Sequence, residues 1–228
     1  AHGKAKMLPI CAPEIRERDN FTLNTGRNRD QWHTMSRSGK APKLGSHLAE
    51  PYAELHPDDA ANLGVEIGDL LELSNTYGRA ILRARITDHA AKGQIFAPMH
   101  WTRQQSSAGL INTLAAPSVD PISGQPATKN TAVIARKFEA HWFAFAASAK
   151  PINLGAEYAA IARALTGWQG EFAGLERPKD WEIFARNALS LPDATVSEMR
   201  DQNGKATRLA FYEGDRLVGA FFAGPNPV

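Results

Sequence analysis

The sequence predicts a β-rich α+β fold in two parts, a β-rich domain at residues 1–138 and a smaller α+β appendix at residues 139–228. Three observations lead to this prediction. Short apolar segments separated by glycine and proline turns recur through the first part, as is typical of strands joined by tight connections. Aromatic and alanine-rich sequence begins near Lys137, and two stretches beyond it have helical patterns. The chain then ends on two apolar segments arranged as a hairpin.

The first part has one predicted helix among its strands. Pro57 suits the first turn of this helix and Gly64 suits a left-handed exit. Asp58 and Asp59 favour the positive end of the helix dipole. Residues 1–20 read as an irregular lead-in. Strands are predicted at residues 21–23, 51–55, 70–73, 80–86, 94–97 and 131–135.

Residues 98–130 hold too many prolines and glycines for a long regular element. Long structured loops inside compact domains are often functional, so this stretch is a place to look for a site. In the appendix, helices are expected near residues 156–166 and 179–189. A hairpin of residues 207–212 and 216–222 is expected to follow, joined through Glu213-Gly214-Asp215.

Composition excludes several classes of protein. With 26 Lys and Arg against 24 Asp and Glu, the net charge of +2 gives no general attraction to nucleic acid. No apolar run reaches the roughly 18 residues that a membrane span needs. The single cysteine, Cys11, rules out an internal disulfide framework or a self-contained iron–sulfur cluster, and with no histidine nearby we interpret it as inert. We therefore expect neither a nucleic-acid nor a membrane partner.

Common catalytic signatures are missing from the chain. Gly39-Lys40 lacks the earlier glycine and the following Ser or Thr of a phosphate-binding loop. The sequence also has no Gly-x-Ser-x-Gly elbow, no His-Glu-x-x-His pair and no Cys-x-x-Cys pair. We accordingly assign no catalytic and no metal-ligating residue, and a free-standing hydrolase or metalloprotease is disfavoured.

A polar segment directly after the first strand is the first candidate binding site. A strand that ends in Thr-Gly lets backbone N–H groups approach a phosphate closely, and Arg27 and Arg29 beside it would neutralise its charge. Asn28, Gln31 and His33 offer hydrogen bonds to the edge of a heterocycle. The alternative is an exposed polar turn that Trp32 anchors by half-burial. The candidate residues are Asn24, Thr25, Gly26, Arg27, Asn28, Gln31, Trp32, His33 and Thr34.

Two further polar segments follow. His100 and Trp101 come just after the strand that ends at Ala97, where strand-end loops commonly carry function. Asn112 is followed, after a proline-rich stretch, by Lys129. Each has an ordinary alternative: His100 as a satisfied surface histidine beside a packed tryptophan, and Lys129 as a solvated charge.

Taken in order, these segments resemble the C-terminal molybdopterin-dinucleotide-binding domain of the dimethyl sulfoxide reductase family, over about residues 3–136. Within that family, the pattern is most similar to the bacterial assimilatory nitrate reductase catalytic subunit. Periplasmic nitrate reductases typically have an aromatic pair where this chain has Met99-His100-Trp101, which favours the assimilatory branch. The resemblance rests on Asn24-Thr25-Gly26-Arg27, Gln31-Trp32-His33-Thr34-Met35, Ala97-Pro98-Met99-His100-Trp101 and Leu110-Ile111-Asn112, followed by Asp120-Pro121 and Lys129.

The resemblance implies a double-psi β-barrel (ADC-like) of about six strands, to which the α+β appendix is attached. It implies that residues 25–34 contact the guanine dinucleotide and pterin of bis(molybdopterin guanine dinucleotide). His100 or Trp101 would then face the pterin, while Asn112 and Lys129 would bind further cofactor groups. In such enzymes, molybdenum and the cofactor carry the reduction of nitrate to nitrite. Their metal-ligating side chain and iron–sulfur cysteines lie in other segments, so we expect this chain alone to be inactive and to lack bound cofactor.

The partners implied by the resemblance are the remainder of the same polypeptide and an electron donor protein or domain, in the cytoplasm. Two alternatives stay open. One keeps the fold and cofactor but assigns another molybdopterin enzyme, such as formate dehydrogenase or periplasmic nitrate reductase. The other is a non-enzymatic interaction module in which residues 139–228 dock a partner.

Overall fold

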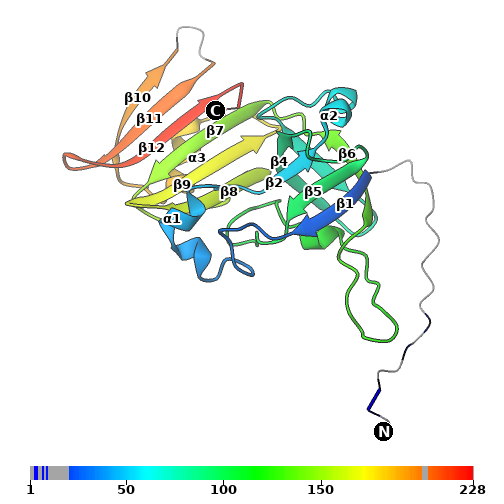
Figure 1. Ribbon diagram of the computed structural model, residues 1–228. Coiled ribbons are helices and arrows are strands. Elements are labelled where there is room, and N and C mark those ends of the chain that lie inside the picture. The colour runs from blue at the N-terminus through cyan, green and yellow to red at the C-terminus, as the bar shows by residue number, and fades with distance from the viewer. Residues whose placement is uncertain (1–2, 5–6, 8, 10–20, 202–204, 228) are drawn as a thin grey trace.

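The computed structural model describes residues 3–4, 7, 9, 21–201 and 205–227. Cys11 and most of the predicted lead-in at residues 1–20 lie outside these residues. The described chain folds into a closed barrel and an open sheet that lie side by side (Figure 1). The prediction of a β-rich fold that contains a barrel is therefore confirmed.

The barrel closes in the strand order β1-β5-β2-β4-β3-β6. β1 runs parallel to β5 and β2 runs parallel to β4, whereas the other neighbours are antiparallel. Apolar side chains from every strand fill its interior. All six strands overlap those predicted from the sequence. Their bounds are β1 (Phe21–Gly26), β2 (Tyr52–Leu55), β3 (Leu70–Ser74), β4 (Arg79–Ile86), β5 (Gln94–Pro98) and β6 (Thr131–Lys137).

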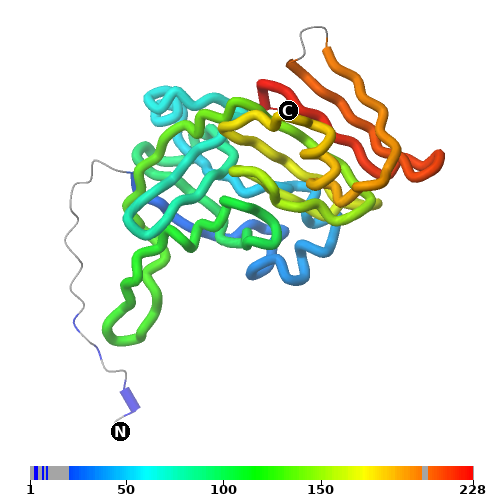
Figure 2. The backbone as a smooth tube through the Cα atoms, turned by 180° about the vertical axis from the view of Figure 1, so that it is seen from behind, coloured from blue at the N-terminus to red at the C-terminus, as the bar shows by residue number. Residues whose placement is uncertain are grey.

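Short helices connect the barrel strands. α2 (Pro57–Leu63) begins at a proline and ends at Gly64, whose φ of 65° is left-handed, as predicted. Three further helical turns, η1 (Ser38–Lys40), α1 (Pro42–Gly45) and η2 (Ile111–Leu114), lie in the loops. The stretch at residues 98–130 is otherwise irregular. Its last part forms an arm, closed by a bridge between Val119 and Pro126, that extends away from the barrel (Figure 2).

The open sheet is antiparallel throughout, in the order β10-β11-β12-β7-β9-β8. The predicted C-terminal hairpin is confirmed, and its turn contains Gly214 at a φ of 61°. Three strands of this sheet, β7, β9 and β10, were not predicted. The bounds are β7 (Trp142–Ser148), β8 (Tyr158–Ala164), β9 (Gly167–Gly174), β10 (Thr195–Arg200), β11 (Thr207–Glu213) and β12 (Arg216–Gly224).

The helix predicted near residues 156–166 is wrong, because this stretch forms strand β8. Its first four residues are all buried. Tyr158 and Ala160 pack toward the barrel, and Ala159 and Ile161 pack into the core on the opposite face of the sheet. A strand covered on both faces is a continuous apolar run, which hydrophobic periodicity cannot distinguish from a buried helix. Tertiary packing therefore overrides the helix propensity of its alanines.

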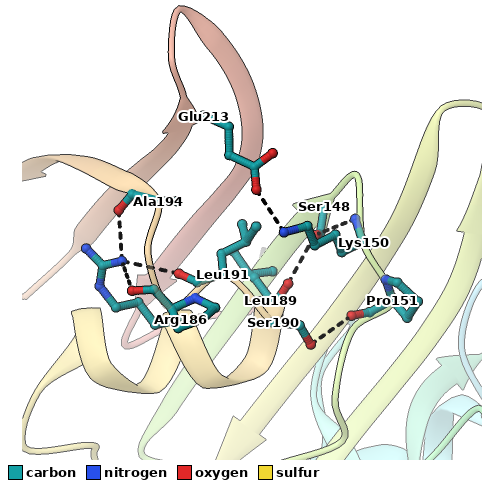
Figure 3. A network of polar contacts seen from close by, with 10 residues as sticks. Ser148, Lys150, Pro151, Arg186, Leu189, Ser190, Leu191, Ala194 and Glu213 are labelled. Atoms are coloured by element: carbon teal, nitrogen blue, oxygen red, sulfur yellow. Dashed lines mark hydrogen bonds and ion pairs between the residues drawn. The ribbon is translucent and has the colours of Figure 1, made fainter.

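Helix α3 (Trp181–Leu189) covers one face of the open sheet, and its prediction is confirmed. Asp180 caps its first turn by accepting a hydrogen bond from the Ile183 N–H at 3.0 Å. At the other end, Arg186 donates to the carbonyl oxygens of Leu191, Pro192 and Ala194 at 2.8–3.2 Å (Figure 3). None of the described helices has both the length and the apolar character needed to cross a bilayer.

The barrel and the open sheet share a buried apolar cluster. Leu70 and Ile81 of the barrel contact Phe143, Tyr158 and other side chains of the sheet in this cluster. Phe138, at the predicted domain boundary, is a member of the same cluster. The division into residues 1–138 and 139–228 stays a prediction, because the two sheets are distinct but their cores are continuous there.

Candidate functional site

The three polar segments singled out from the sequence leave the barrel at one end. β1 and β5 are parallel and end together, with Gly26 opposite Pro98. β6 is antiparallel to β1 and begins at this same end, with Thr131 opposite Leu23. Strand pairing therefore gathers residues 24–34, 99–101 and 128–130, which we call the polar end of the barrel.

His100 joins the first two segments. It is fully buried, and its Nε2 accepts a hydrogen bond from the Asn28 backbone N–H at 2.8 Å. Its Nδ1 lies 2.6 Å from the carbonyl oxygen of His33. Because a carbonyl only accepts and a backbone N–H only donates, this geometry fixes the tautomer with hydrogen on Nδ1. His100 is not the surface histidine of the alternative interpretation, and it holds the loop after β1 in place.

The third segment is attached to the first by two hydrogen bonds. The Thr25 hydroxyl donates to the carbonyl oxygen of Thr128 at 3.1 Å, and the Lys129 amine donates to the carbonyl oxygen of Thr25. Asn24 donates to the Gln94 side chain at 3.3 Å. Lys129 is exposed, as the alternative of a solvated charge expects, but its amine is also bonded to the edge of β1.

Asn112 lies at the same end but apart from the other segments. It is exposed on η2, and its side chain makes no hydrogen bond within the described part of the chain. Asn75, in the turn after β3, ties η2 to the start of β6 by donating to the carbonyl oxygens of Leu114 and Ala132 at 2.8 and 3.3 Å. The structure thus places Asn112 near the polar end without joining it to residues 24–34.

Several predicted site residues in the loop after β1 are exposed, including Arg27, Trp32, His33 and Thr34. Trp32 is 59% exposed, so it does not anchor the loop by half-burial as the alternative interpretation required. Its ring meets His33 edge-on at 4.8 Å, and Arg27 lies 5.9 Å from its centroid. His33 has a φ of 45°, a left-handed conformation that is uncommon outside glycine and is found at ligand-binding loops.

The two arginines predicted to neutralise a phosphate differ in environment. Arg29 forms two hydrogen bonds with Asp30, at 3.0 and 3.1 Å, and His47 Nδ1 lies 2.7 Å from the same carboxylate. These hydrogen bonds, that of Arg29 first, lower the pKa of Asp30 below its ordinary value. Arg29 is therefore already paired, which leaves Arg27 as the better phosphate ligand.

Asn28 carries an unpaired buried donor. Its backbone N–H is bonded to His100, and its side-chain oxygen accepts from the Tyr52 hydroxyl at 2.8 Å. Its Nδ2 is buried and has no hydrogen-bond partner among the described residues. A buried unpaired donor costs about 1–3 kcal/mol, so such groups call for an explanation such as a ligand. The residues at the polar end therefore fit a ligand that offers acceptors.

Tyr52 is a site residue that the sequence analysis did not find. It is buried at the start of β2, and burial, with the charge of Glu54, raises the pKa of its hydroxyl above the ordinary value. The hydroxyl therefore stays protonated and holds the Asn28 amide. The sequence alone gives no sign of this role, because a tyrosine at the start of a partly apolar strand is an ordinary barrel residue. The pairing of β2 with β5 is what brings Tyr52 to the loop after β1.

Gln31 and Trp101 are both buried and border a cavity of about 160 Å³. The cavity lies between the loop after β1, the segment after β5 and strand β8 of the open sheet. Among the described residues, no group of three or more His, Cys, Asp or Glu side chains is placed to hold a metal ion. The site's polar groups are thus suited to hydrogen bonding and charge neutralisation.

Comparison with known proteins identifies the barrel. Residues 21–132 match the family described as the molydopterin dinucleotide binding domain. These residues belong to that family. The family predicted from the three polar segments is thereby confirmed, and the matched residues include every predicted site residue.

The sequence similarity to curated relatives extends beyond residues 21–132. A nitrate reductase of Klebsiella oxytoca is 36% identical over 186 residues, which cover 79% of this chain and 22% of the relative. The alpha subunit of an F420-dependent formate dehydrogenase of Methanocaldococcus jannaschii is 31% identical over 136 residues, covering 58% of this chain and 20% of the relative. The chain therefore matches a minor part of each of these larger proteins.

Proposed function

We propose that this chain is the cofactor-binding part of a molybdenum-dependent nitrate reductase of nitrate assimilation. The observation that carries the proposal is the unpaired buried Asn28 amide, at the end of the barrel where three polar segments meet. Similarity to a nitrate reductase over 79% of the chain supports the choice of enzyme. The same proposal includes a cytoplasmic location, an electron donor protein, and iron–sulfur and molybdenum-ligating segments elsewhere in the enzyme.

The residues of the polar end have distinct parts in this proposal. Asn28 would donate its free amide hydrogens to the cofactor, and Arg27 would neutralise a phosphate. Gly26 fits at the strand end because it has no Cβ, which would lie 2.5 Å from the Phe96 ring. Its lack of a side chain also lets the backbone approach a phosphate closely. Bis(molybdopterin guanine dinucleotide) with molybdenum, when bound, supplies the two-electron chemistry. The chain's own contribution is to bind and orient that group.

The barrel is proposed to be of the double-psi kind. Two parallel strand pairs, β1 with β5 and β2 with β4, interrupt an otherwise antiparallel barrel of six strands. Parallel neighbours need crossover connections, and other strands of the barrel do lie between the two members of each parallel pair along the chain. This arrangement supports the interlocked topology that the family resemblance implies.

Binding of guanine nucleotides to the purified chain tests the site. We expect GDP to bind in isothermal titration calorimetry, and Asn28→Ala to weaken it by about 1 kcal/mol, or about fivefold in Kd, because one hydrogen bond is lost. Asn62→Ala is the matched control, since Asn62 is exposed on α2, which follows β2 at the opposite end of the barrel. Equal weakening by both substitutions, or no binding of GDP to the unaltered chain, would contradict the proposal.

A formate dehydrogenase is the second candidate, supported by 31% identity to a formate dehydrogenase subunit. Turnover of nitrate and of formate by the complete enzyme separates the two, because the domain alone is expected to bind cofactor without reducing substrate. Nitrate turnover by the 228-residue chain would show that expectation to be wrong.

A further inference from the structure

The cavity beside Gln31 and Trp101 is built by both sheets. One wall comes from the loop after β1 and from the segment that follows β5, and the other comes from β8 and β9. Its volume is about 160 Å³, enough to admit several water molecules. It is therefore large enough for a small ion with one or two waters.

The charged residues lining this cavity are all cations. Lys40 and Arg163 line it, and none of its lining residues is acidic. Arg163 lies over the ring of Trp168, another lining residue, with its guanidinium carbon 5.0 Å from the ring centroid. Within the described part of the chain, neither cation has an acidic partner, whereas the half-buried Arg83 and Arg186 are each paired with a glutamate.

Two of the three glutamine amides at the cavity, those of Gln31 and Gln105, have their acceptors occupied and their donors free. The Gln31 side-chain oxygen accepts from the Ser38 hydroxyl at 2.8 Å. The Gln105 side-chain oxygen accepts from the Thr102 hydroxyl at 2.5 Å and from the Thr102 N–H at 3.3 Å. Neither NH₂ group has a hydrogen-bond acceptor among the residues that the structure describes. These two amides therefore add hydrogen-bond donors to the positive charge of the lining.

We propose that this cavity binds a small oxyanion, held by the guanidinium of Arg163, the amine of Lys40 and the amides of Gln31 and Gln105. Such an anion offers only acceptors, which matches these four donor groups. The oxyanion is either a free ion, such as nitrate, or the phosphate group of a nucleotide bound at the polar end. The site gives residues 139–228 a direct part in ligand binding, because Arg163 and Trp168 belong to the open sheet.

Titration of the purified chain with sodium nitrate and sodium phosphate, at constant chloride, tests this site through tryptophan fluorescence, because Trp101 and Trp168 line the cavity. We expect a saturable change with at least one anion. Arg163→Gln should weaken binding about tenfold or more, as expected for a lost charge-assisted hydrogen bond. Arg208→Gln, which alters an exposed arginine on β11, should bind as the unaltered chain does.

A second variant guards against loss of folding. Gln105→Glu keeps the side-chain shape but adds a negative charge, so it should abolish anion binding while the thermal unfolding temperature stays within a few degrees. Prior addition of GDP identifies the source of the anion: loss of the nitrate response points to the nucleotide's phosphate, and its persistence points to a free ion.

Two outcomes would overturn the proposal: no saturable change with either anion, or binding that is equal in Arg163→Gln, Gln105→Glu and the unaltered chain. Neither outcome depends on GDP binding, which calorimetry measures separately. Failure of the oxyanion site is thus distinguishable from failure of the proposed cofactor site.

Discussion

Two regions bury polar groups next to the barrel, and they differ in whether those groups satisfy one another. At the junction with the open sheet, Arg83, Glu50, Tyr158 and Glu171 form a network in which each member has a partner. At the polar end, the network around Asn28 leaves a buried donor unpaired. A closed network holds two sheets together, whereas an open one leaves hydrogen-bonding capacity for something outside the chain.

The junction network centres on one guanidinium. Arg83 donates two hydrogen bonds to the Glu50 carboxylate, both at 3.0 Å, and a third to the carbonyl oxygen of Gly68 at 2.6 Å. The Tyr158 hydroxyl donates to the same carboxylate at 2.5 Å. Glu171 is 3.8 Å from Arg83 and has no closer cation among the described residues. Two acidic side chains thus face one positive charge.

The largest predicted effect is on the closed network. Arg83→Met should lower the free energy of unfolding by about 3–5 kcal/mol, because it leaves the largely buried Glu50 without its cation. Urea unfolding followed by circular dichroism measures this. Arg200→Met is the control, since Arg200 is 65% exposed and lies 2.6 Å from Glu198, a surface pair that contributes little. A similar loss in both variants would show that the junction is no more than a surface pair.

Glu171 gives the junction a pH dependence. Burial, together with the charge of Glu50, raises its pKa to about 8 in the folded chain, while Arg83 opposes the rise. The unfolded chain loses this proton at a lower pH, so the stability that the protonated group contributes is complete in acid and is lost as pH rises toward 8. The slope is at most about 1.4 kcal/mol per pH unit.

Glu171→Gln tests this assignment. The amide cannot lose a proton, so the variant should be more stable than the unaltered chain at pH 8 and should show a flatter stability profile between pH 5 and 8. Unfolding temperatures measured across this range give the comparison. Parallel profiles for the two proteins would place the titrating group elsewhere.

The sequence predicted the barrel strands and the three polar segments because their signals are local. Turn residues such as Gly26 and Gly64 mark where elements end, and polar runs after strands mark strand-end loops. Tyr52, Gln105 and Arg163 were not predicted, because their positions depend on which strands pair. The same limit applies to β8, whose alanines predict a helix until both of its faces are covered.

The smallest predicted effect sharpens the comparison at Tyr52. Tyr52→Phe removes the hydrogen bond to the Asn28 side-chain oxygen and should lower the free energy of unfolding by about 1 kcal/mol. Tyr77→Phe, at a tyrosine that is 54% exposed, should lower it by much less.

The decisive measurement is the affinity for GDP, which the closed network at the junction is not expected to affect. If Tyr52 orients the Asn28 amide toward a ligand, Tyr52→Phe should weaken GDP binding as well as stability, whereas Arg83→Met should reduce stability alone wherever the chain remains folded. A loss of stability in Tyr52→Phe without any change in GDP affinity would make the polar end a second closed network, and the contrast between the two regions would disappear.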